Sequence, residues 1–434
     1  MLDRTWILVT ALLLATVQAY AAPKVESWQT ARGAKVMYVQ APDLPMVDVR
    51  VVFDGGSARD DDNPGIATLV NALLAEGAGE WDADQVAERL EDVGAQLGND
   101  SLRDMAYVSL RSLTDEPVLR VALDTLAAIL AQPRFSPDDV ERQRQLMLIA
   151  LRKQDEAPGD VASRAFYKAL YGDHPYGHDP LGDRDSVTAV TREALVAFHQ
   201  RYYAARNAVI AIVGAVSREQ AEKMAEELTA GLPEGEAAPP LPPVASAAAR
   251  SLDVDFDASQ SHLYLGVPGM KRGDEDYFPL YVGNHVLGGG GLVSLLSQEV
   301  REKRGLSYSV YSYFYPMRVP GPFLMSAQTR NDRAGETLRV LRETLGEYLD
   351  QGPSDAELTA AKRNLTGGFP LRVASNKKIV QYIAMMGFYD YPLDYLDTFV
   401  ARVEAVSAED IRRAFRDRID AGRLVTVRVG GAGG

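Results

Sequence analysis

The feature that most constrains the fold of this chain is an internal repeat that relates its two halves. The first half contains a strand, an acidic loop with Arg59 and an apolar helix, in the segment VDVRVVFDGGSARDDDNPGIATLV. The second half repeats this order, with Arg272 in the loop, in SHLYLGVPGMKRGDEDYFPLYVGNHVL. Arg59 and Arg272 lie 213 residues apart.

A second pair of segments supports the same relation near the end of each half. The pair is VTAVTREALVAFHQRYYAARNAVIAIVG and VARVEAVSAEDIRRAFRDRIDAGRLVTVRVG, in which Val187 corresponds to Val403 and Glu193 to Glu409. The offset here is 216 residues. Two distant matches at nearly one offset indicate that the halves arose by duplication and share a fold.

A stretch rich in Pro and Ala, GLPEGEAAPPLPPVASAAAR at residues 231–250, separates the halves and contains little that could pack. We therefore expect an N-terminal domain at residues 23–230, a flexible linker, and a C-terminal domain at residues 251–434. A chain of 434 residues with 46% hydrophobic content can form two cores. Because strands alternate with amphipathic helices in each half, we predict an α+β fold of two similar lobes, each a mainly antiparallel sheet covered by helices.

The first 22 residues have the pattern of a secretory signal. Arg4 precedes an apolar run over residues 6–17, and small residues follow at Ala21 and Ala22. The run is shorter than the roughly 20 residues of a membrane span, although a retained anchor is the alternative. We expect a signal peptide at residues 1–22, cleavage near Ala21 or Ala22, and export to a bacterial periplasm.

Composition excludes several classes of function. The chain has no cysteine, which rules out disulfides, thiolate metal sites and a cysteine nucleophile. Its net charge of −14 argues against nucleic acid and anionic lipid as partners. We therefore predict no nucleic-acid partner, and no membrane partner once the signal is removed.

The segment PGIATLVNALLAEGAG, residues 64–79, predicts a buried helix. Asn63 can cap this helix and Pro64 suits its first turn. The helix has an apolar stripe at helical spacing, formed by Ile66, Leu69, Val70, Leu73 and Leu74.

Several blocks, taken in order, resemble the M16 (pitrilysin-like) zinc peptidases in their short two-lobed form, which includes the subunits of the mitochondrial processing peptidase. The N-terminal blocks are GIATLVNALLAEGAG, ERLEDVGAQLGND and HPYGHDPLGDRDSVTAVTREALVAFHQRYYAARNAVIAIVG. The C-terminal blocks are NHVLGGGGLVSLLSQEVREKRGLSYSVYSYF and AKRNLTGGFPLRVASN. The resemblance covers nearly the whole chain after residue 22.

The resemblance implies a zinc site that this sequence does not contain. Active members carry His-x-x-Glu-His on the first helix, with two histidine ligands and a glutamate general base. Those positions are Thr68, Asn71 and Ala72 here, and the position of the third ligand, seven residues after Glu141, is Leu148. Hydroxyl and amide groups are weak zinc ligands and the other two side chains have no lone pair. We expect no metal at these positions.

The five histidines do not rebuild such a site in the sequence. His174 and His178 are four residues apart, but Pro175 and Gly177 place them in a loop, where a structural role is favoured. The other three are isolated from one another: His199, His262 and His285.

The second half contains VREKRGLSY, which matches the C-terminal Arg/Tyr signature of the family, with Arg301 and Tyr308 seven residues apart. Gly305 is expected to end a helix, so that Arg301 lies on its last turn and Tyr308 at the start of a strand. In the family, the resemblance implies, the Arg holds a substrate carbonyl and the Tyr hydroxyl stabilises the oxyanion. These two residues are the candidate catalytic residues.

Each of the two residues also has a purely structural interpretation. Arg301 can be one solvated charge beside Lys303 and Arg304. Tyr308 can belong to an aromatic strand that continues through Tyr311, Tyr313 and Phe314.

A run of four glycines precedes this signature: Gly288, Gly289, Gly290 and Gly291. Such a run can let a substrate backbone approach closely, or it can be an ordinary helix entry. It is not a phosphate loop, because no GxGxxG and no following Gly-Lys-Ser/Thr is present. Ser375 and Lys378 match Ser-x-x-Lys, a short pattern that arises often by chance, and no Gly-x-Ser-x-Gly exists.

Half of a composite active site suggests a partner. The first hypothesis is the metal-free subunit of a heteromeric M16-type metallopeptidase, which binds peptide and supplies Arg301 and Tyr308. An M16 homologue carrying His-x-x-Glu-His would then supply zinc and the general base, and this chain would hold no cofactor of its own. The alternative is an inert pseudopeptidase that binds peptides or serves as a structural subunit.

Overall fold

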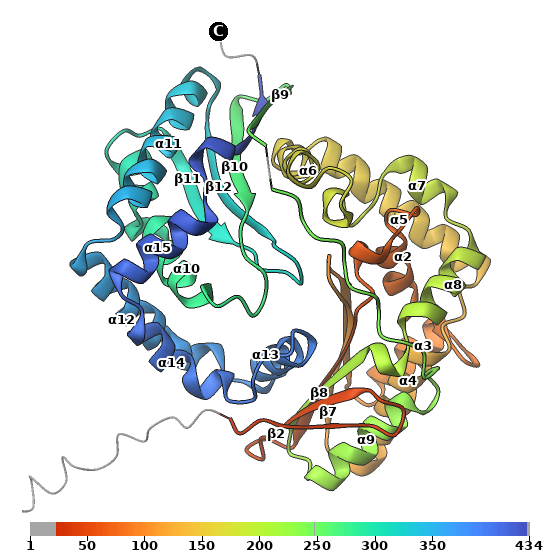
Figure 1. Ribbon diagram of the computed structural model, residues 1–434. Coiled ribbons are helices and arrows are strands. Elements are labelled where there is room, and N and C mark those ends of the chain that lie inside the picture. Colours follow the sequence, from red (N-terminus) through yellow and green to blue (C-terminus); the bar gives the residue numbers. More distant parts are fainter. Residues whose placement is uncertain (1–22, 247, 432–434) are drawn as a thin grey trace, which may run out of the picture.

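Each half of the chain forms one β-sheet with helices packed against it, and the two lobes lie beside each other (Figure 1). The computed structural model describes residues 23–246 and 248–431. The predicted signal peptide, residues 1–22, lies outside the described residues. In the part that is described, no helix is long and apolar enough to cross a membrane.

The first sheet has six strands in the order β1-β2-β8-β3-β7-β6. Their bounds are β1 (Glu26–Gln29), β2 (Lys35–Gln40), β3 (Met46–Phe53), β6 (Gln96–Ser101), β7 (Ala106–Leu113) and β8 (Ala208–Gly214). The second sheet has five strands in the order β11-β12-β10-β13-β9. Their bounds are β9 (Arg250–Asp255), β10 (Gln260–Pro268), β11 (Ser307–Phe314), β12 (Pro322–Arg330) and β13 (Val425–Gly430). A short ladder of β4 (Gly77–Ala78) and β5 (Trp81–Asp82) completes the strands.

The two sheets have the same strand order, as the repeat predicts. Read from the edge, β2-β8-β3-β7-β6 corresponds to β9-β13-β10-β12-β11, and β1 is an addition to the first sheet. Each sheet has one parallel pair, β2 with β8 and β9 with β13, and its other pairs are antiparallel. The α+β prediction with mainly antiparallel sheets is therefore confirmed.

Helices of similar order follow in each half. The first half has α2 (Ile66–Leu73), α3 (Ala83–Glu91), α4 (Glu116–Ala131), α5 (Pro137–Asp155), α6 (Pro158–Tyr171), α7 (Arg184–Ala189), α8 (Arg192–Tyr202) and α9 (Arg218–Ala230). The second half has α10 (Tyr277–Asn284), α11 (Ala334–Gln351), α12 (Asp355–Arg372), α13 (Asn376–Phe388), α14 (Tyr395–Ala405) and α15 (Ala408–Arg418).

The lobes are interlocked because each lends one helix to the sheet of the other. Helix α6 packs on β10 and β13 of the second sheet, and α13 packs on β2, β3 and β8 of the first. In Figure 1, α13 lies against the strands of the first lobe although it belongs to the second half of the sequence. Small residues permit both approaches: the ring of Phe166 lies over Gly266, and Gly387 lies against Met37 and Val209.

The Pro/Ala-rich stretch between the halves packs more than its composition suggests. Leu232 is buried in the N-terminal core, which corrects the expectation that nothing in this stretch packs. The carbonyl of Pro233 accepts a 2.8 Å bond from the amide of Ala205, and the carbonyl of Pro242 lies 3.0 Å from Nε2 of His174. The start and the middle of the stretch are thus fixed to the N-terminal half.

Helix α2 begins differently from the sequence prediction. It starts at Ile66 rather than at residue 64 and ends at Leu73, and its N-cap is Gly65 at φ 95° with no side-chain cap from Asn63. The capping oxygens come instead from Asp60, which accepts from the amides of Gly65 (2.7 Å) and Ala67 (3.0 Å). A carboxylate five residues upstream can reach these amides because the chain turns back in between, a path that local spacing does not reveal.

His199 couples folding to pH. Its imidazole is buried, Nε2 lies 2.9 Å from the carbonyl oxygen of Leu130, and burial lowers the pKa from 6.5 to about 4. Because the folded pKa lies below the unfolded one, the unfolded chain binds more protons between these values. The stability from this residue is therefore complete above pH 6.5, and about 3 kcal/mol of it is lost as the pH falls to 4.

We expect His199→Gln to flatten the fall in unfolding free energy between pH 7 and pH 4 by about that amount, about 3 kcal/mol. Urea titrations of both proteins at several pH values measure it. An unchanged pH profile in the variant would contradict the assignment.

Candidate functional site

The exposed-to-core face of α2 carries polar groups that are already engaged within the fold. Thr68 Oγ1 donates a 2.6 Å bond to the carbonyl of Pro180. The buried amide of Asn71 donates weakly to the hydroxyl of Tyr203 (3.4 Å), and its Oδ1 accepts a 2.9 Å bond from Asn99. These contacts tie α2 to strand β6 and to the loop before α7.

Helix α5 packs against α2 and brings the fourth predicted position to the same region. Leu148 is partly buried and packs against the N-terminal core, and Ala72 is partly exposed. Together with Thr68 and Asn71 they offer one hydroxyl, one amide and two hydrocarbon groups, a donor set that does not suit zinc. Among residues 23–246 and 248–431, no group of three or more His, Asp or Glu is placed to hold a metal ion.

The histidines that lie in loops have structural contacts. His174 Nδ1 accepts a 3.0 Å bond from the amide of Tyr176, and His178 Nε2 lies 3.0 Å from Oδ2 of Asp60. Burial raises the pKa of Asp60, while its contact with His178 opposes that shift. His178 thus supports the carboxylate that caps α2.

The predicted Arg/Tyr pair does come together. Arg301 lies on the turn Ser297–Glu302, and its guanidinium carbon is 4.9 Å from the centre of the Tyr308 ring. Between them Gly305 has φ 59°, and its amide donates a 3.0 Å bond to the carbonyl of Arg301. Gly305 therefore ends the turn as the sequence predicts, and the chain enters β11.

A β-bulge directs Tyr308 out of the sheet. The pairing of β11 with β12 passes from Ser307 opposite Thr329 to Ser309 opposite Gln328, which leaves Tyr308 unpaired. The hydroxyl of Ser307 lies 2.6 Å from the carbonyl of Ser309 and 2.8 Å from that of Gln328. Bulges reorient side chains at sheet edges, and this one leaves the Tyr308 side chain 84% exposed.

The neighbours of Tyr308 on the strand are packed differently. Tyr313 stacks on Tyr311 with ring centres 5.9 Å apart, and Phe314 packs on Phe323 at 4.8 Å. Tyr308 makes neither kind of contact with them. It stands apart from the aromatic strand of the structural interpretation.

Arg301 also differs from the basic residues beside it. Lys303 and Arg304 both pair with Glu299, at 2.5 Å and 2.6 Å. Arg301 has no carboxylate partner in the described part of the chain, and its contact is the Tyr308 ring. The geometry therefore favours an interacting pair over two unrelated surface residues.

The glycine run divides between packing and exposure. Gly288 is buried, and a side chain there would collide with the backbone of Ser312 on β11, so its close approach is internal to the fold. Gly289 and Gly291 are exposed, and Gly291 has φ 65°. The segment contains the turns His285–Gly289 and Gly291–Val293.

The Ser-x-x-Lys match is a helix cap. Ser375 is the N-cap of α13, and its Oγ accepts a 3.4 Å bond from the amide of Lys378. Lys378 Nζ donates to the carbonyl of Leu371 at 2.6 Å. The pair is not arranged for nucleophilic catalysis.

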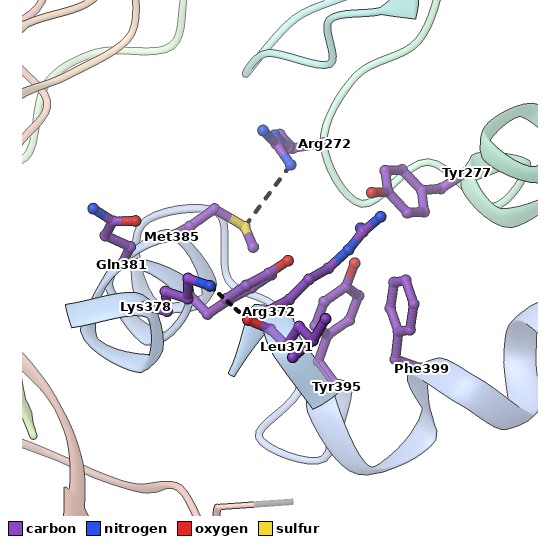
Figure 2. Close-up of a pocket in the computed structure, with 10 residues that line it drawn as sticks. Arg272, Tyr277, Leu371, Arg372, Lys378, Gln381, Met385, Tyr395 and Phe399 are labelled. Carbon is purple, nitrogen blue, oxygen red and sulfur yellow. Dashed lines mark hydrogen bonds between the residues drawn. The ribbon is translucent and has the colours of Figure 1, made fainter. Parts of the chain in front are cut away.

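Sequence reasoning missed a cavity of about 580 Å³ in the second lobe, between α10, α12, α13 and α14 (Figure 2). Arg272, Arg372 and Lys378 line it, together with aromatic side chains such as Tyr277 and Phe399. The repeat singled out Arg272 as the counterpart of Arg59, which is the one signal in the sequence that points here.

Comparison with protein-family models gives two matches that together span most of the chain. Residues 35–184 match the model for insulinase (peptidase family M16), and residues 189–365 match the model for the peptidase M16 inactive domain.

Curated relatives and solved structures agree with these matches. An uncharacterized zinc protease of Mycobacterium leprae is 32% identical over 346 residues, which is 78% of this chain and 77% of that protein. One of Streptomyces coelicolor is 28% identical over 361 residues, 81% of this chain and 78% of that one. A crystal structure titled peptidase M16 inactive domain from Pseudomonas fluorescens superposes with a TM-score of 0.91 at 41% identity, covering 94% of this chain and 98% of that chain. A Helicobacter pylori protease has the same fold, with a TM-score of 0.86 at 21% identity over 95% and 100% of the two chains.

Proposed function

This chain belongs to peptidase family M16, and from that premise we propose that it is the metal-free subunit of a heteromeric M16 metallopeptidase. It binds peptide substrate and contributes Arg301 and Tyr308 to a site completed by another chain. That partner is an M16 homologue with an intact His-x-x-Glu-His motif, which supplies zinc and the general base.

One contrast between the two lobes carries the proposal. The four positions that would hold zinc and the base in an active member are Thr68, Asn71, Ala72 and Leu148, and their side chains are hydrogen-bonded or packed within the fold. The Arg301 and Tyr308 pair is accessible and free of carboxylate partners among the described residues.

The chemistry of the pair suits a peptide bond under attack. The planar guanidinium of Arg301 can hold a substrate carbonyl oxygen by charge-assisted hydrogen bonds. The Tyr308 hydroxyl can donate to the oxyanion that forms when the carbonyl carbon becomes tetrahedral. Both residues act by positioning and by stabilising charge, so neither has to generate the nucleophile.

The predicted signal peptide supports export, and we propose that the chain works in the periplasm of a bacterial cell with an exported partner. This location follows from the pattern of residues 1–22 alone. The acidic balance of the chain, −14, fits a protein with no nucleic-acid partner.

The alternative is an inert pseudopeptidase, a peptide-binding or structural subunit. The observation that favours it is the solved relative whose title calls it an inactive domain, at 41% identity. The two roles differ in what Arg301 and Tyr308 do: substitutions of the pair alter cleavage by the complex in the first role and leave it unchanged in the second. The experiment is co-expression with exported M16 homologues from the same genome, followed by purification of the complex and assay of peptide cleavage.

The purified single chain is expected to hold far less than one zinc per molecule, because hydroxyl, amide and hydrocarbon groups stand at the ligand positions. Elemental analysis after dialysis against a weak chelator measures this, with the zinc-bearing partner treated in parallel as the control. About one tightly held zinc per chain would contradict the proposal.

Restoring the motif by Thr68→His, Asn71→Glu, Ala72→His and Leu148→Glu is expected to give weak activity at best. The site of Asn71 is buried against Asn99 and Tyr203, which are not arranged to orient a general base. Loss of supporting contacts around metal ligands commonly costs about 10- to 100-fold in affinity or activity. Zinc content and the peptide cleavage rate of the quadruple variant measure it, and cleavage at the rate of the active partner would show that the supporting contacts are intact.

A further inference from the structure

The cavity of about 580 Å³ in the second lobe concentrates positive charge without a carboxylate to balance it. Arg272 enters from the loop between β10 and α10, Arg372 from the end of α12, and Lys378 from the first turn of α13 (Figure 2). No Asp or Glu is among the residues that line it. In a chain with a net charge of −14, such a local excess of cations is unusual.

None of the three cations has an ion-pair partner within residues 23–246 and 248–431. Arg272 Nη1 lies 4.0 Å from the sulfur of Met385, and its Nε is buried without a hydrogen-bond partner. Arg372 Nη1 donates a 2.6 Å bond to the hydroxyl of Tyr281. A buried cation costs free energy unless an anion or good acceptors compensate it, so this arrangement is suited to receive an anion.

The internal repeat shows what Arg272 lacks. Its counterpart Arg59, 213 residues earlier, is buried and makes a two-pronged ion pair with Asp54 at 2.7 Å and 3.0 Å. The same offset places Val267 at the position of Asp54, since 54 plus 213 is 267. The second lobe has therefore kept the arginine and replaced its carboxylate with a hydrocarbon side chain.

A smaller cavity of about 180 Å³ shares Arg272 and Met385 and continues the positive surface toward the first lobe. It adds Arg50 and Arg103, and the one carboxylate in its lining is Asp104. Asp104 is already engaged, because it accepts 2.7 Å bonds from the Tyr389 hydroxyl and the Arg318 amide and a further bond from Tyr176. The carboxylate in this second cavity is thus committed to other partners.

The remaining walls of the larger cavity define the rest of the ligand. Tyr277, Tyr382, Tyr395 and Phe399 give it an aromatic lining. Its volume lies in the range of small-molecule sites, roughly 300–1,000 Å³, and far exceeds what an inorganic ion fills. A ligand that satisfies both parts has an anionic head and an apolar body.

We propose that this cavity binds an organic carboxylate, with its head between Arg272 and Arg372 and its apolar body against the aromatic wall. Planar guanidinium groups match carboxylates by paired hydrogen bonds. The carboxylate can belong to the C-terminal residue of a peptide or to a free carboxylic acid, since the recognised chemistry is the same. The site does not depend on the proposed subunit role or on Arg301 and Tyr308.

Calorimetric titration of the full chain with N-acetylphenylalanine tests the proposal, with N-acetylphenylalaninamide as the neutral match. We expect the acid to bind saturably and the amide to bind at least about tenfold more weakly, because a hydrogen bond between charged groups contributes roughly that much. A peptide ending in a free Phe carboxylate separates the sources: tighter binding than the acid indicates a peptide C-terminus, and equal binding a free acid.

Two variants localise the binding. Arg372→Gln and Arg272→Gln should each weaken binding of the acid by about tenfold or more. Arg363→Gln, an exposed position on the same helix α12, should leave it unchanged. If Arg272→Gln fails to fold, Arg372→Gln carries the test alone. Equal binding of acid and amide, binding of inorganic phosphate as tight as that of the acid, or no loss in Arg372→Gln would overturn the assignment.

Discussion

Replacing Tyr308 by Phe is expected to lower the kcat of the complex with its zinc-bearing partner by about 10² to 10³, with little change in KM. The substitution removes one hydroxyl and keeps the ring on which the Arg301 guanidinium lies. If that hydroxyl donates only to the oxyanion, the loss falls on the transition state rather than on substrate binding. Steady-state cleavage of a fluorogenic peptide measures both constants.

Tyr311→Phe is the matched control, since Tyr311 is on the same edge strand and is 38% exposed. It should leave kcat unchanged, because its ring stacks on Tyr313 in the regular part of β11. Both variants should co-purify with the partner. Wild-type kcat in Tyr308→Phe would favour the inert pseudopeptidase.

Phe166→Ala is expected to destabilise the whole chain by about 3–5 kcal/mol, the usual cost of deleting a fully buried aromatic ring. Phe166 lies on α6, is buried against the second sheet, and fills the space over Gly266. Because α6 belongs to the first half and covers the sheet of the second, the cavity lies at the contact that interlocks the lobes. Denaturant titration followed by circular dichroism measures the change.

Lys168→Ala on the same helix is the control, because Lys168 is 64% exposed and pairs only with Asp173 at the surface. An exposed pair of this kind contributes about 0–1 kcal/mol. If Phe166→Ala cost no more than the control, the exchanged helices would not be what joins the two lobes.

The sequence predicts the architecture because a repeat read at one offset constrains both halves at once. The shared order of the two sheets follows from it. The exchange of α6 and α13 does not follow, since the apolar stripe of a helix shows that it is buried and does not show which sheet covers it. The small residues that permit the exchange, Gly266 and Gly387, have no local signature of that role.

The candidate site is predictable in part for a related reason. A motif places Arg301 and Tyr308 near each other, but the bulge that exposes Tyr308 depends on pairing with β12, which lies beyond the motif. Asp60 caps α2 in place of Asn63 because the intervening turn returns the chain to the helix start. The unpaired state of Arg272 was accessible, because the repeat aligns Asp54 with Val267.

The central claim is that this chain supplies half of an active site, and the initial rate of peptide cleavage by reconstituted chains tests it most directly. The zinc-bearing partner alone, this chain alone, and an equimolar mixture are compared at the same total zinc. The account predicts near-background cleavage by each chain alone and a rate at least about 10² higher in the mixture, the effect of one missing oxyanion donor. Cleavage by the partner alone at the rate of the mixture would contradict it.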